Sequence, residues 1–93
     1  MAKKNEQKKL AIAVNKRNAA YDVYIGRPSK WGNPFVIGRD GSREQVIEKY
    51  RMWIQQQPHL LGSLCELQGK RLGCYCKPQA CHGDVLAELA NNL

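Results

Sequence analysis

The stretch Leu72-Gly73-Cys74-Tyr75-Cys76-Lys77-Pro78-Gln79-Ala80-Cys81-His82-Gly83-Asp84 decides how the last part of the chain folds. Residues 72–76 have the pattern of the end of a strand, and residues 84–93 have the apolar spacing of a helix. Three of the four cysteines and one of the two histidines therefore lie at a strand–loop–helix junction. Such junctions are common places for ligand-binding and catalytic groups in α/β proteins.

Two strands and one long helix are predicted ahead of this junction. Residues 10–14 form a short apolar run, and residues 21–25 are rich in aromatic and β-branched side chains, which favours strands at both places. A helix is predicted to begin at Ser42, because Ser42 and Gln45 have the spacing of a capping box. Pro58 is predicted to end this helix.

The order of elements predicts the fold class. A shorter helix is expected over residues 60–67, and a strand over residues 71–76. The last helix is expected to begin near Asp84 and to bury its apolar side chains, Val85, Leu86, Leu89 and Leu93. This order predicts a small single-domain α/β protein with a sheet of about three to four strands packed by about two to three helices. The sheet is expected to be at least partly parallel, because the last strand follows a helix.

The charge of the chain is uneven. The net charge is +7, and the 43% hydrophobic content is that of a globular protein. Residues 1–17 hold six basic residues and one acidic residue, whereas the remainder holds nine and seven. We therefore expect a flexible basic tail at residues 1–9 and one domain at residues 10–93. A basic tail either attracts nucleic-acid phosphates or simply keeps the protein in solution, and both interpretations stay open.

The sequence shows neither a secretion signal nor a membrane-spanning segment, and this decides the expected compartment. The lysine-rich start has no apolar segment of the kind found in secretion signals, and no apolar run is long enough to cross a bilayer. We therefore expect a cytoplasmic protein with no membrane partner, in which the cysteines stay reduced. Clustered reduced thiols serve as metal ligands, as nucleophiles or as packing groups.

The cysteine–histidine cluster has three interpretations. Cys74, Cys76, Cys81 and His82 supply the four N/S ligands that zinc prefers, although the spacing lacks the usual Cys-x2-Cys pairs. Alternatively, a helix N-terminus attracts anions and lowers the pKa of a thiol, which makes Cys76, Cys81 and His82 candidate catalytic residues. Asp84 beside them is a candidate ligand-binding residue. The third interpretation is packing, because cysteine is commonly buried.

A second unusual stretch follows the second predicted strand, at residues 27–35. Its candidate ligand-binding residues are Arg27, Ser29, Lys30, Trp31 and Asn33, in which the charged and hydroxyl groups hold a phosphate or carboxylate and the indole stacks on a base. Alternatively, Trp31 and Phe35 fold back onto the core. If the two strands run parallel in one sheet, this loop and the cysteine–histidine loop emerge at one edge and form one pocket.

These two motifs resemble a known family. Residues 24–35 (Tyr-Ile-Gly-Arg-Pro-Ser-Lys-Trp-Gly-Asn-Pro-Phe), together with 73–78 (Gly-Cys-Tyr-Cys-Lys-Pro) and 81–84 (Cys-His-Gly-Asp), resemble a family of small phage and bacterial proteins classified only as a domain of unknown function. The resemblance implies an intracellular phage or bacterial protein, in the host cytoplasm if phage-encoded, and it leaves the activity open. The junction is also similar to that of another uncharacterised family, where an arginine stands in place of Gly83.

The leading functional hypothesis combines the two loops. A pocket formed by loops 26–35 and 76–84 is expected to bind an anionic ligand, either a nucleotide or a nucleic-acid end. The alternatives are a zinc-stabilised nucleic-acid-binding module and a non-enzymatic phage protein that docks on a host protein through Trp31. The residues leave open whether the chain is an enzyme and whether it uses a cofactor; zinc is the one cofactor that they suggest.

Overall fold

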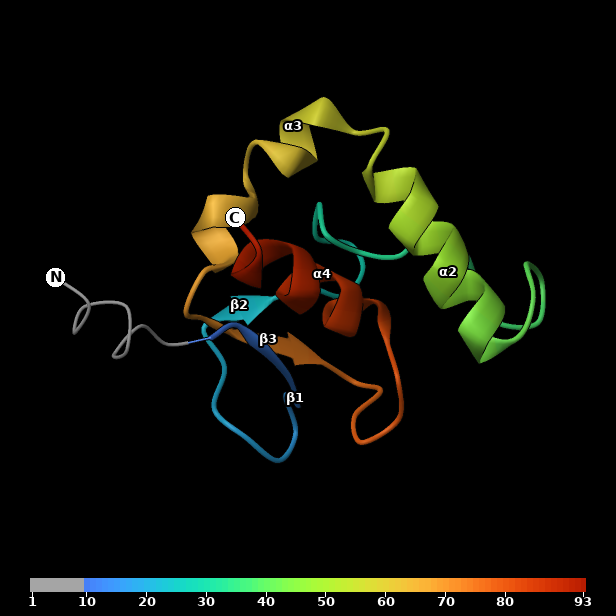
Figure 1. Ribbon diagram of the computed structural model, residues 1–93. Coiled ribbons are helices and arrows are strands. Elements are labelled where there is room, and N and C mark those ends of the chain that lie inside the picture. Colours follow the sequence, from blue (N-terminus) through green and yellow to red (C-terminus); the bar gives the residue numbers. More distant parts are fainter. Residues whose placement is uncertain (1–9) are drawn as a thin grey trace, which may run out of the picture.

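The computed structural model describes residues 10–93, which form a small sheet covered by helices (Figure 1). The elements follow in the order β1 (Ile12–Asn15), β2 (Val23–Tyr24), α2 (Arg43–Ile54), α3 (Pro58–Leu61), the 3₁₀ helix η1 (Leu64–Leu67), β3 (Arg71–Cys74) and α4 (His82–Asn91). The predicted small α/β fold is therefore confirmed. The tail predicted at residues 1–9 lies outside the described residues.

The sheet has three strands in the order β1-β3-β2, and β3 pairs in parallel with both neighbours. In the register, Ile12 of β1 aligns with Arg71, and Val23 of β2 aligns with Leu72. Because all strands point the same way, the segments that leave their carboxyl ends emerge at one edge of the sheet.

The two faces of β3 meet different parts of the chain. Side chains alternate along a strand, so Leu72 and Cys74 point into the core and Gly73 faces the opposite side. Tyr21, in the segment that connects β1 with β2, lies directly over Gly73. A Cβ atom at Gly73 would lie 2.8 Å from Cγ of Tyr21. The missing side chain of Gly73 therefore lets this connection cross close to the sheet.

Helix α4 covers the core face of the sheet and contacts β1 and β3 (Figure 1). Its close approach depends on Gly83, which is buried in the first turn. A Cβ atom at Gly83 would lie 2.7 Å from Cδ1 of Ile25 and 3.0 Å from Cβ of Ala13. A larger residue would push the helix away from the sheet.

Helix α2 begins as the sequence predicts. The backbone N–H of Gln45 donates to Oγ of Ser42 at 3.2 Å, and the backbone N–H of Ser42 donates to Oε1 of Gln45 at 2.8 Å. This is the expected capping box. The predicted end is wrong, because α2 stops at Ile54 and Pro58 instead begins α3. Proline fits the first turn of a helix, where its missing N–H would have no partner.

Other predicted boundaries also change. The helix predicted over residues 60–67 is two short pieces, α3 and η1. The last strand stops at Cys74 because pairing with β1 and β2 ends there. Helix α4 begins at His82, two residues before Asp84, and Leu93 lies beyond its end with 61% of its surface exposed.

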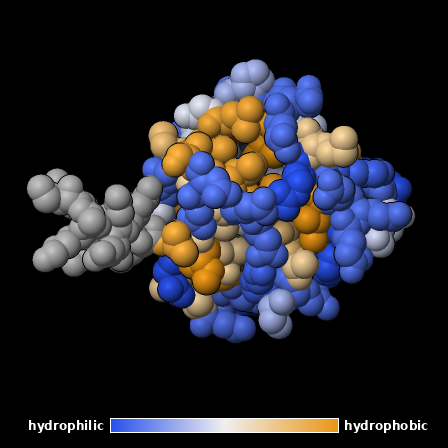
Figure 2. All heavy atoms as spheres, viewed as in Figure 1, coloured by the Kyte–Doolittle hydropathy of each residue, from blue (hydrophilic) through white to orange (hydrophobic). Residues whose placement is uncertain are grey.

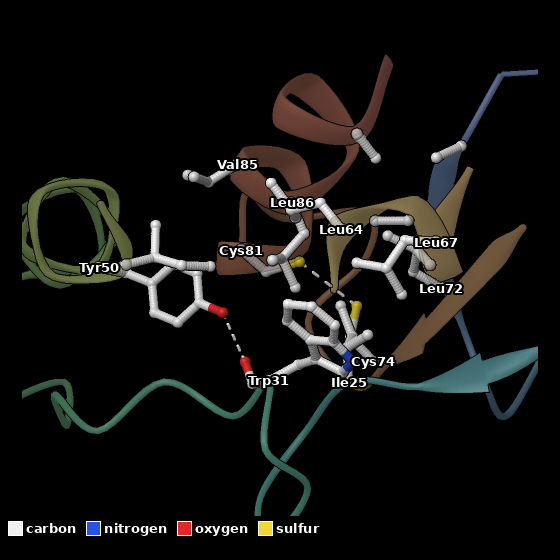
Figure 3. Packing of buried hydrophobic residues seen from close by; sticks show 14 of the residues in the cluster. Ile25, Trp31, Tyr50, Leu64, Leu67, Leu72, Cys74, Cys81, Val85 and Leu86 are labelled. Atoms are coloured by element: carbon white, nitrogen blue, oxygen red, sulfur yellow. Dashed lines mark hydrogen bonds between the residues drawn. The ribbon is translucent and has the colours of Figure 1, made fainter. Parts of the chain in front are cut away.

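The core lies between the sheet, α4 and α2, and Figure 3 shows its largest side chains packed together. Trp31 and Tyr50 meet there, although Trp31 comes from the long loop between β2 and α2 (residues 25–42) and Tyr50 comes from α2. On the face shown in Figure 2, hydrophobic residues gather in patches between hydrophilic ones. No helix within residues 10–93 has both the length and the apolar character needed to cross a bilayer.

The close approach at Gly83 is testable by a matched pair of glycine substitutions. In a helix, Gly→Ala normally stabilises, but Gly83→Ala is expected to lower the free energy of unfolding by about 1–3 kcal/mol because the new methyl overpacks the helix–sheet contact. Gly62→Ala is the control, since its new Cβ would meet its nearest atom at an ordinary 3.4 Å. Urea unfolding measures both, and equal stability of the two variants would contradict the packing argument.

Candidate functional site

A cavity of about 320 Å³ opens at the edge of the sheet where β2 and β3 end. Its walls come from loops 26–35 and 76–84, with the starts of α2 and α4. Both loops follow strand ends, and the parallel pairing of β2 with β3 brings these ends together. The cavity thus occupies the position where open α/β sheets bind ligands.

Two buried hydrogen bonds fix the long loop against the helices. The hydroxyl of Tyr50 in α2 donates to the carbonyl oxygen of Trp31 at 2.7 Å (Figure 3). Burial raises the pKa of Tyr50, so the hydroxyl keeps its proton and remains a donor. At the beginning of the same loop, Nε2 of His82 lies 2.8 Å from the carbonyl oxygen of Ile25. The loop therefore has fixed supports from α2 and from α4.

The bond to Ile25 decides the chemistry of His82. A carbonyl oxygen only accepts, so Nε2 carries the proton and Nδ1 is the bare nitrogen of the neutral ring. Burial lowers the pKa of His82, and the charge of Arg27 lowers it further, while the bond to Ile25 partly opposes both effects. At neutral pH the ring is therefore uncharged, and its Nδ1 is a hydrogen-bond acceptor.

The cysteines divide into a buried pair and a cavity-facing thiol. Sγ of Cys74 and Sγ of Cys81 lie 3.4 Å apart (Figure 3), and each residue is 2% exposed. Burial raises the pKa of Cys81 to about 12, and the hydrogen bond with Cys74 adds to this effect. A helix N-terminus is expected to lower the pKa of a thiol, but the pKa of Cys81 is raised instead. Cys76 is half-buried and lines the cavity.

Two arginines give the cavity a positive charge. Arg27 lies exposed after β2, and Arg43 is the first residue of α2. Arg43 donates from Nη1 to the carbonyl oxygen of Ala80 at 3.1 Å, which links the start of α2 to the cysteine–histidine loop. Within residues 10–93, neither arginine forms a salt bridge, and no Asp or Glu lines the cavity.

Of the five candidate ligand residues in the long loop, Arg27 and Asn33 line the cavity. The other three have partners elsewhere. Oγ of Ser29 accepts from the backbone N–H of Trp31 at 3.3 Å, and Lys30 pairs with Glu66 at 3.1 Å.

Trp31 and Asn33 hold the loop. The Trp31 ring is 2% exposed in the core, as in the alternative in which it folds back onto the core. The amide of Asn33 donates to the carbonyl of Val46 at 3.2 Å, while its Oδ1 accepts from Phe35 N–H at 2.9 Å.

Asp84 supports the helix start rather than the cavity. Its carboxylate accepts from the backbone N–H of Cys81 at 3.1 Å and pairs with Lys77 at 2.6 Å. A carboxylate in the first turn satisfies an unpaired N–H and interacts favourably with the helix dipole.

The predicted zinc ligands are not gathered around one point. Within residues 10–93, no group of three or more His, Cys, Asp or Glu residues is placed so that it can hold a metal ion. Cys74 and Cys81 contact each other, but Nε2 of His82 is engaged by a backbone carbonyl.

Sequence reasoning missed several residues that line the cavity. Tyr24, Phe35 and Tyr75 contribute aromatic rings, and Arg43 contributes a charge. Tyr24 and Tyr75 stand 6.2 Å apart between ring centroids, with planes at 74°. The available signals were weak: each tyrosine lies at the end of a predicted strand, and Arg43 directly follows the N-cap of a helix.

The neutral, buried His82 makes stability depend on pH. The pKa of His82 in the folded state lies below its usual value of 6.5, so the unfolded chain binds the proton more tightly. Stability is therefore complete above pH 6.5 and is lost as the pH falls below it. Urea unfolding at about pH 7.5 and about pH 5 should show this loss as a lower free energy of unfolding at the lower pH. The loss should be smaller in His82→Gln, whereas the control His59→Gln should show the same loss as the wild type. A wild-type stability that stays constant over this range would contradict the buried neutral state.

The division of the cysteines predicts their reactivity. At neutral pH a thiol-specific chromogenic reagent is expected to modify the exposed Cys65 and the half-buried Cys76 in the folded protein, and Cys74 and Cys81 only after unfolding. A Cys65→Ser variant isolates the signal of Cys76, and its partner Cys65→Ser/Cys76→Ser should be silent while folded. Rapid modification of Cys81 in the folded chain would overturn its assignment as a protonated, buried thiol.

Two viral proteins match the chain over much of its length. An uncharacterised 12.4 kDa protein from the nrdA-td intergenic region of enterobacteria phage T4 is 41% identical over 90 residues, which are 91% of this chain and 82% of the phage protein. Uncharacterised protein R718 of Acanthamoeba polyphaga mimivirus is 40% identical over 86 residues, 73% of this chain and 65% of the mimivirus protein. No solved structure matches the chain.

The family match covers nearly the whole chain. Residues 8–92 match the domain of unknown function DUF4326. The match and the phage relative confirm the resemblance to a phage family of unknown function at the level of the family. The chain belongs to the DUF4326 family.

Proposed function

We propose that the chain binds an anionic ligand carrying a planar ring, either a nucleotide or the nucleotide at a nucleic-acid end. The ligand would occupy the cavity between loops 26–35 and 76–84. One observation carries the proposal: two arginines free of carboxylate partners within residues 10–93 line the same cavity as three aromatic rings.

The charge of the cavity supports a phosphate. The planar guanidinium groups of Arg27 and Arg43 offer paired N–H donors that match phosphate oxygens. With no carboxylate among the lining residues of 10–93, nothing there competes for these donors or repels an anion. The one hydrogen bond from Arg43 to the Ala80 carbonyl uses Nη1 and leaves its other N–H groups for a ligand.

The walls of the cavity support a planar ring. Tyr24, Phe35 and Tyr75 bring aromatic surface, and Val46 and Ile47 add aliphatic surface. The volume of about 320 Å³ lies at the lower end of the range of small-molecule sites. A cavity of this size suits one nucleotide rather than a dinucleotide cofactor.

Cys76 and His82 supply the polar groups we propose for contact with the ligand. Nδ1 of His82 is unprotonated at neutral pH, and within residues 10–93 it has no hydrogen-bond partner. It can therefore accept a hydrogen bond from a ligand N–H or O–H, or take its proton. Cys76 is the thiol for any nucleophilic step, because Cys81 is buried and protonated.

The two alternatives have weaker support. Docking on a host protein through Trp31 requires an exposed indole, and this ring is 2% exposed. A zinc-stabilised module requires a ligand group that residues 10–93 do not assemble. Metal analysis of the purified protein, followed by unfolding in the presence of a chelator, distinguishes the zinc alternative directly.

Binding of nucleoside monophosphates tests the proposed function. Isothermal titration should show a nucleoside 5′-monophosphate binding at least about tenfold more tightly than the nucleoside, because a charge-assisted hydrogen bond contributes about 1.5–3 kcal/mol. Arg43→Ala and Arg27→Ala should each lower the affinity for the monophosphate by a similar factor. Both variants should leave the affinity for the nucleoside nearly unchanged.

Arg51→Ala is the matched control for these variants. It removes the same charge from a surface pair with Glu88, outside the cavity, and it should bind the monophosphate like the wild type. Equal affinity for nucleoside and monophosphate, or no effect of either cavity arginine, would overturn the proposal.

A further inference from the structure

Three tyrosines surround one lysine on the sheet face opposite α4. Nζ of Lys16 lies 5.5 Å from the ring centroid of Tyr21, 5.0 Å from that of Tyr24 and 5.1 Å from that of Tyr75. The guanidinium carbon of Arg17 lies 5.1 Å from the Tyr75 centroid. We call Tyr21, Tyr24 and Tyr75 the tyrosine platform.

Two of the three platform residues are exposed, although they are large and partly apolar, and Tyr24 is half-buried. Tyr21 is 40% exposed and Tyr75 is 51% exposed. Aromatic side chains of this size normally bury their surface in a small domain. Here the core is formed without them, so the fold itself does not account for their gathering.

Two glycines seat the platform against the backbone. A Cβ atom at Gly73 would lie 2.8 Å from Cγ of Tyr21, and one at Gly26 would lie 2.7 Å from Cζ of Tyr24. The hydroxyl of Tyr24 also donates to the carbonyl oxygen of Arg27 at 2.8 Å. These contacts hold the rings in place, and ordered rings lose little entropy when a ligand stacks on them.

The platform is continuous with the cavity. Tyr24 and Tyr75 belong to both, and Arg27, whose carbonyl oxygen accepts from the Tyr24 hydroxyl, also lines the cavity. A strand whose terminal nucleotide occupies the cavity would therefore pass over the platform as it leaves. A free nucleotide would use the cavity alone and leave Tyr21 without a role.

The charges of the platform suit phosphates. Within residues 10–93, neither Lys16 nor Arg17 forms a salt bridge. Cation–π contact places Lys16 over all three rings and Arg17 over the Tyr75 ring, so both cations lie within the aromatic surface. Interleaved cations and aromatic rings are the combination that single-stranded nucleic acids require, because bases stack on the rings and phosphates meet the cations.

From this juxtaposition we propose that the ligand is the end of a single-stranded nucleic acid, with its terminal nucleotide in the cavity and the neighbouring bases on the tyrosine platform. The inference rests on the proposed function, since it assigns the ligand class of the same cavity. The platform supplies stacking and phosphate contacts and thereby favours a strand over a free nucleotide.

Oligonucleotide length provides the test. Fluorescence anisotropy competition would use single-stranded DNA and RNA of one to six nucleotides, with a phosphate at either the 5′ or the 3′ end. Affinity is expected to rise by about fivefold or more for each base that stacks, and then to level off beyond the platform. A closed circular single strand of the same base composition should compete at least about tenfold more weakly, because it has no end to enter the cavity.

Substitutions outside the cavity isolate the platform. Tyr21→Ala and Lys16→Ala should each lower the affinity for the trinucleotide by about fivefold or more. The affinity for the mononucleotide should stay within about twofold of the wild-type value. Tyr21→Phe is the matched control and should retain the wild-type length dependence, because it keeps the ring. Circular dichroism of each variant confirms that the fold is intact.

The outcomes separate the two proposals. Mononucleotide binding without any increase with length overturns the strand-end inference and leaves the proposed function standing. Circular and linear strands that compete equally overturn recognition of an end. Equal competition by an acidic peptide overturns the nucleic-acid assignment, since charge alone would then explain binding. Failure of every nucleotide and oligonucleotide to bind overturns both proposals.

Discussion

The parallel pairing of β3 with both β1 and β2 is the constraint on which the rest of the structure depends. It brings the carboxyl ends of β2 and β3 to one edge, so the two motif loops must meet there. It also makes the chain cross the sheet between β1 and β2, which Gly73 allows. On the other face, Gly83 lets α4 lie close to the sheet and places His82 at the cavity. The two glycines therefore serve opposite faces of the same sheet.

The two motifs divide their residues between support and lining. Trp31 anchors its loop in the core, and Asp84 fixes the start of α4 by accepting from the backbone N–H of Cys81. Both residues thereby position the loops that form the cavity without lining it. Arg27, Cys76 and His82 line the cavity. This division follows from size, because a small domain has few large side chains with which to fill its core. The same short motif therefore contains residues that stabilise the fold and residues that line the cavity.

The fold class and much of the element order could be predicted because they depend on local patterns. The capping box of Ser42 locates the start of α2 to within one residue. The ends were less predictable, since strand length is set by the partner strand and Pro58 fits a first turn as well as it stops a helix. At the site, Arg27 and His82 could be proposed from their motifs, whereas Arg43 had no motif to mark it.

The sequence by itself determined most of the order of the elements and a small α/β class with an at least partly parallel sheet. That the two motif loops meet at one edge depends on the pairing of β2 with β3 in the tertiary structure. Only the tertiary structure decided which side chains in these loops face the cavity and which fill the core, as the burial of Trp31 and Cys81 illustrates. It also assembled the platform by bringing Tyr75 from a distant segment against Tyr21 and Tyr24, which are near neighbours in the chain. The physical reason is that periodicity and capping act over a few residues, whereas side-chain burial and pKa depend on neighbours that only folding brings together.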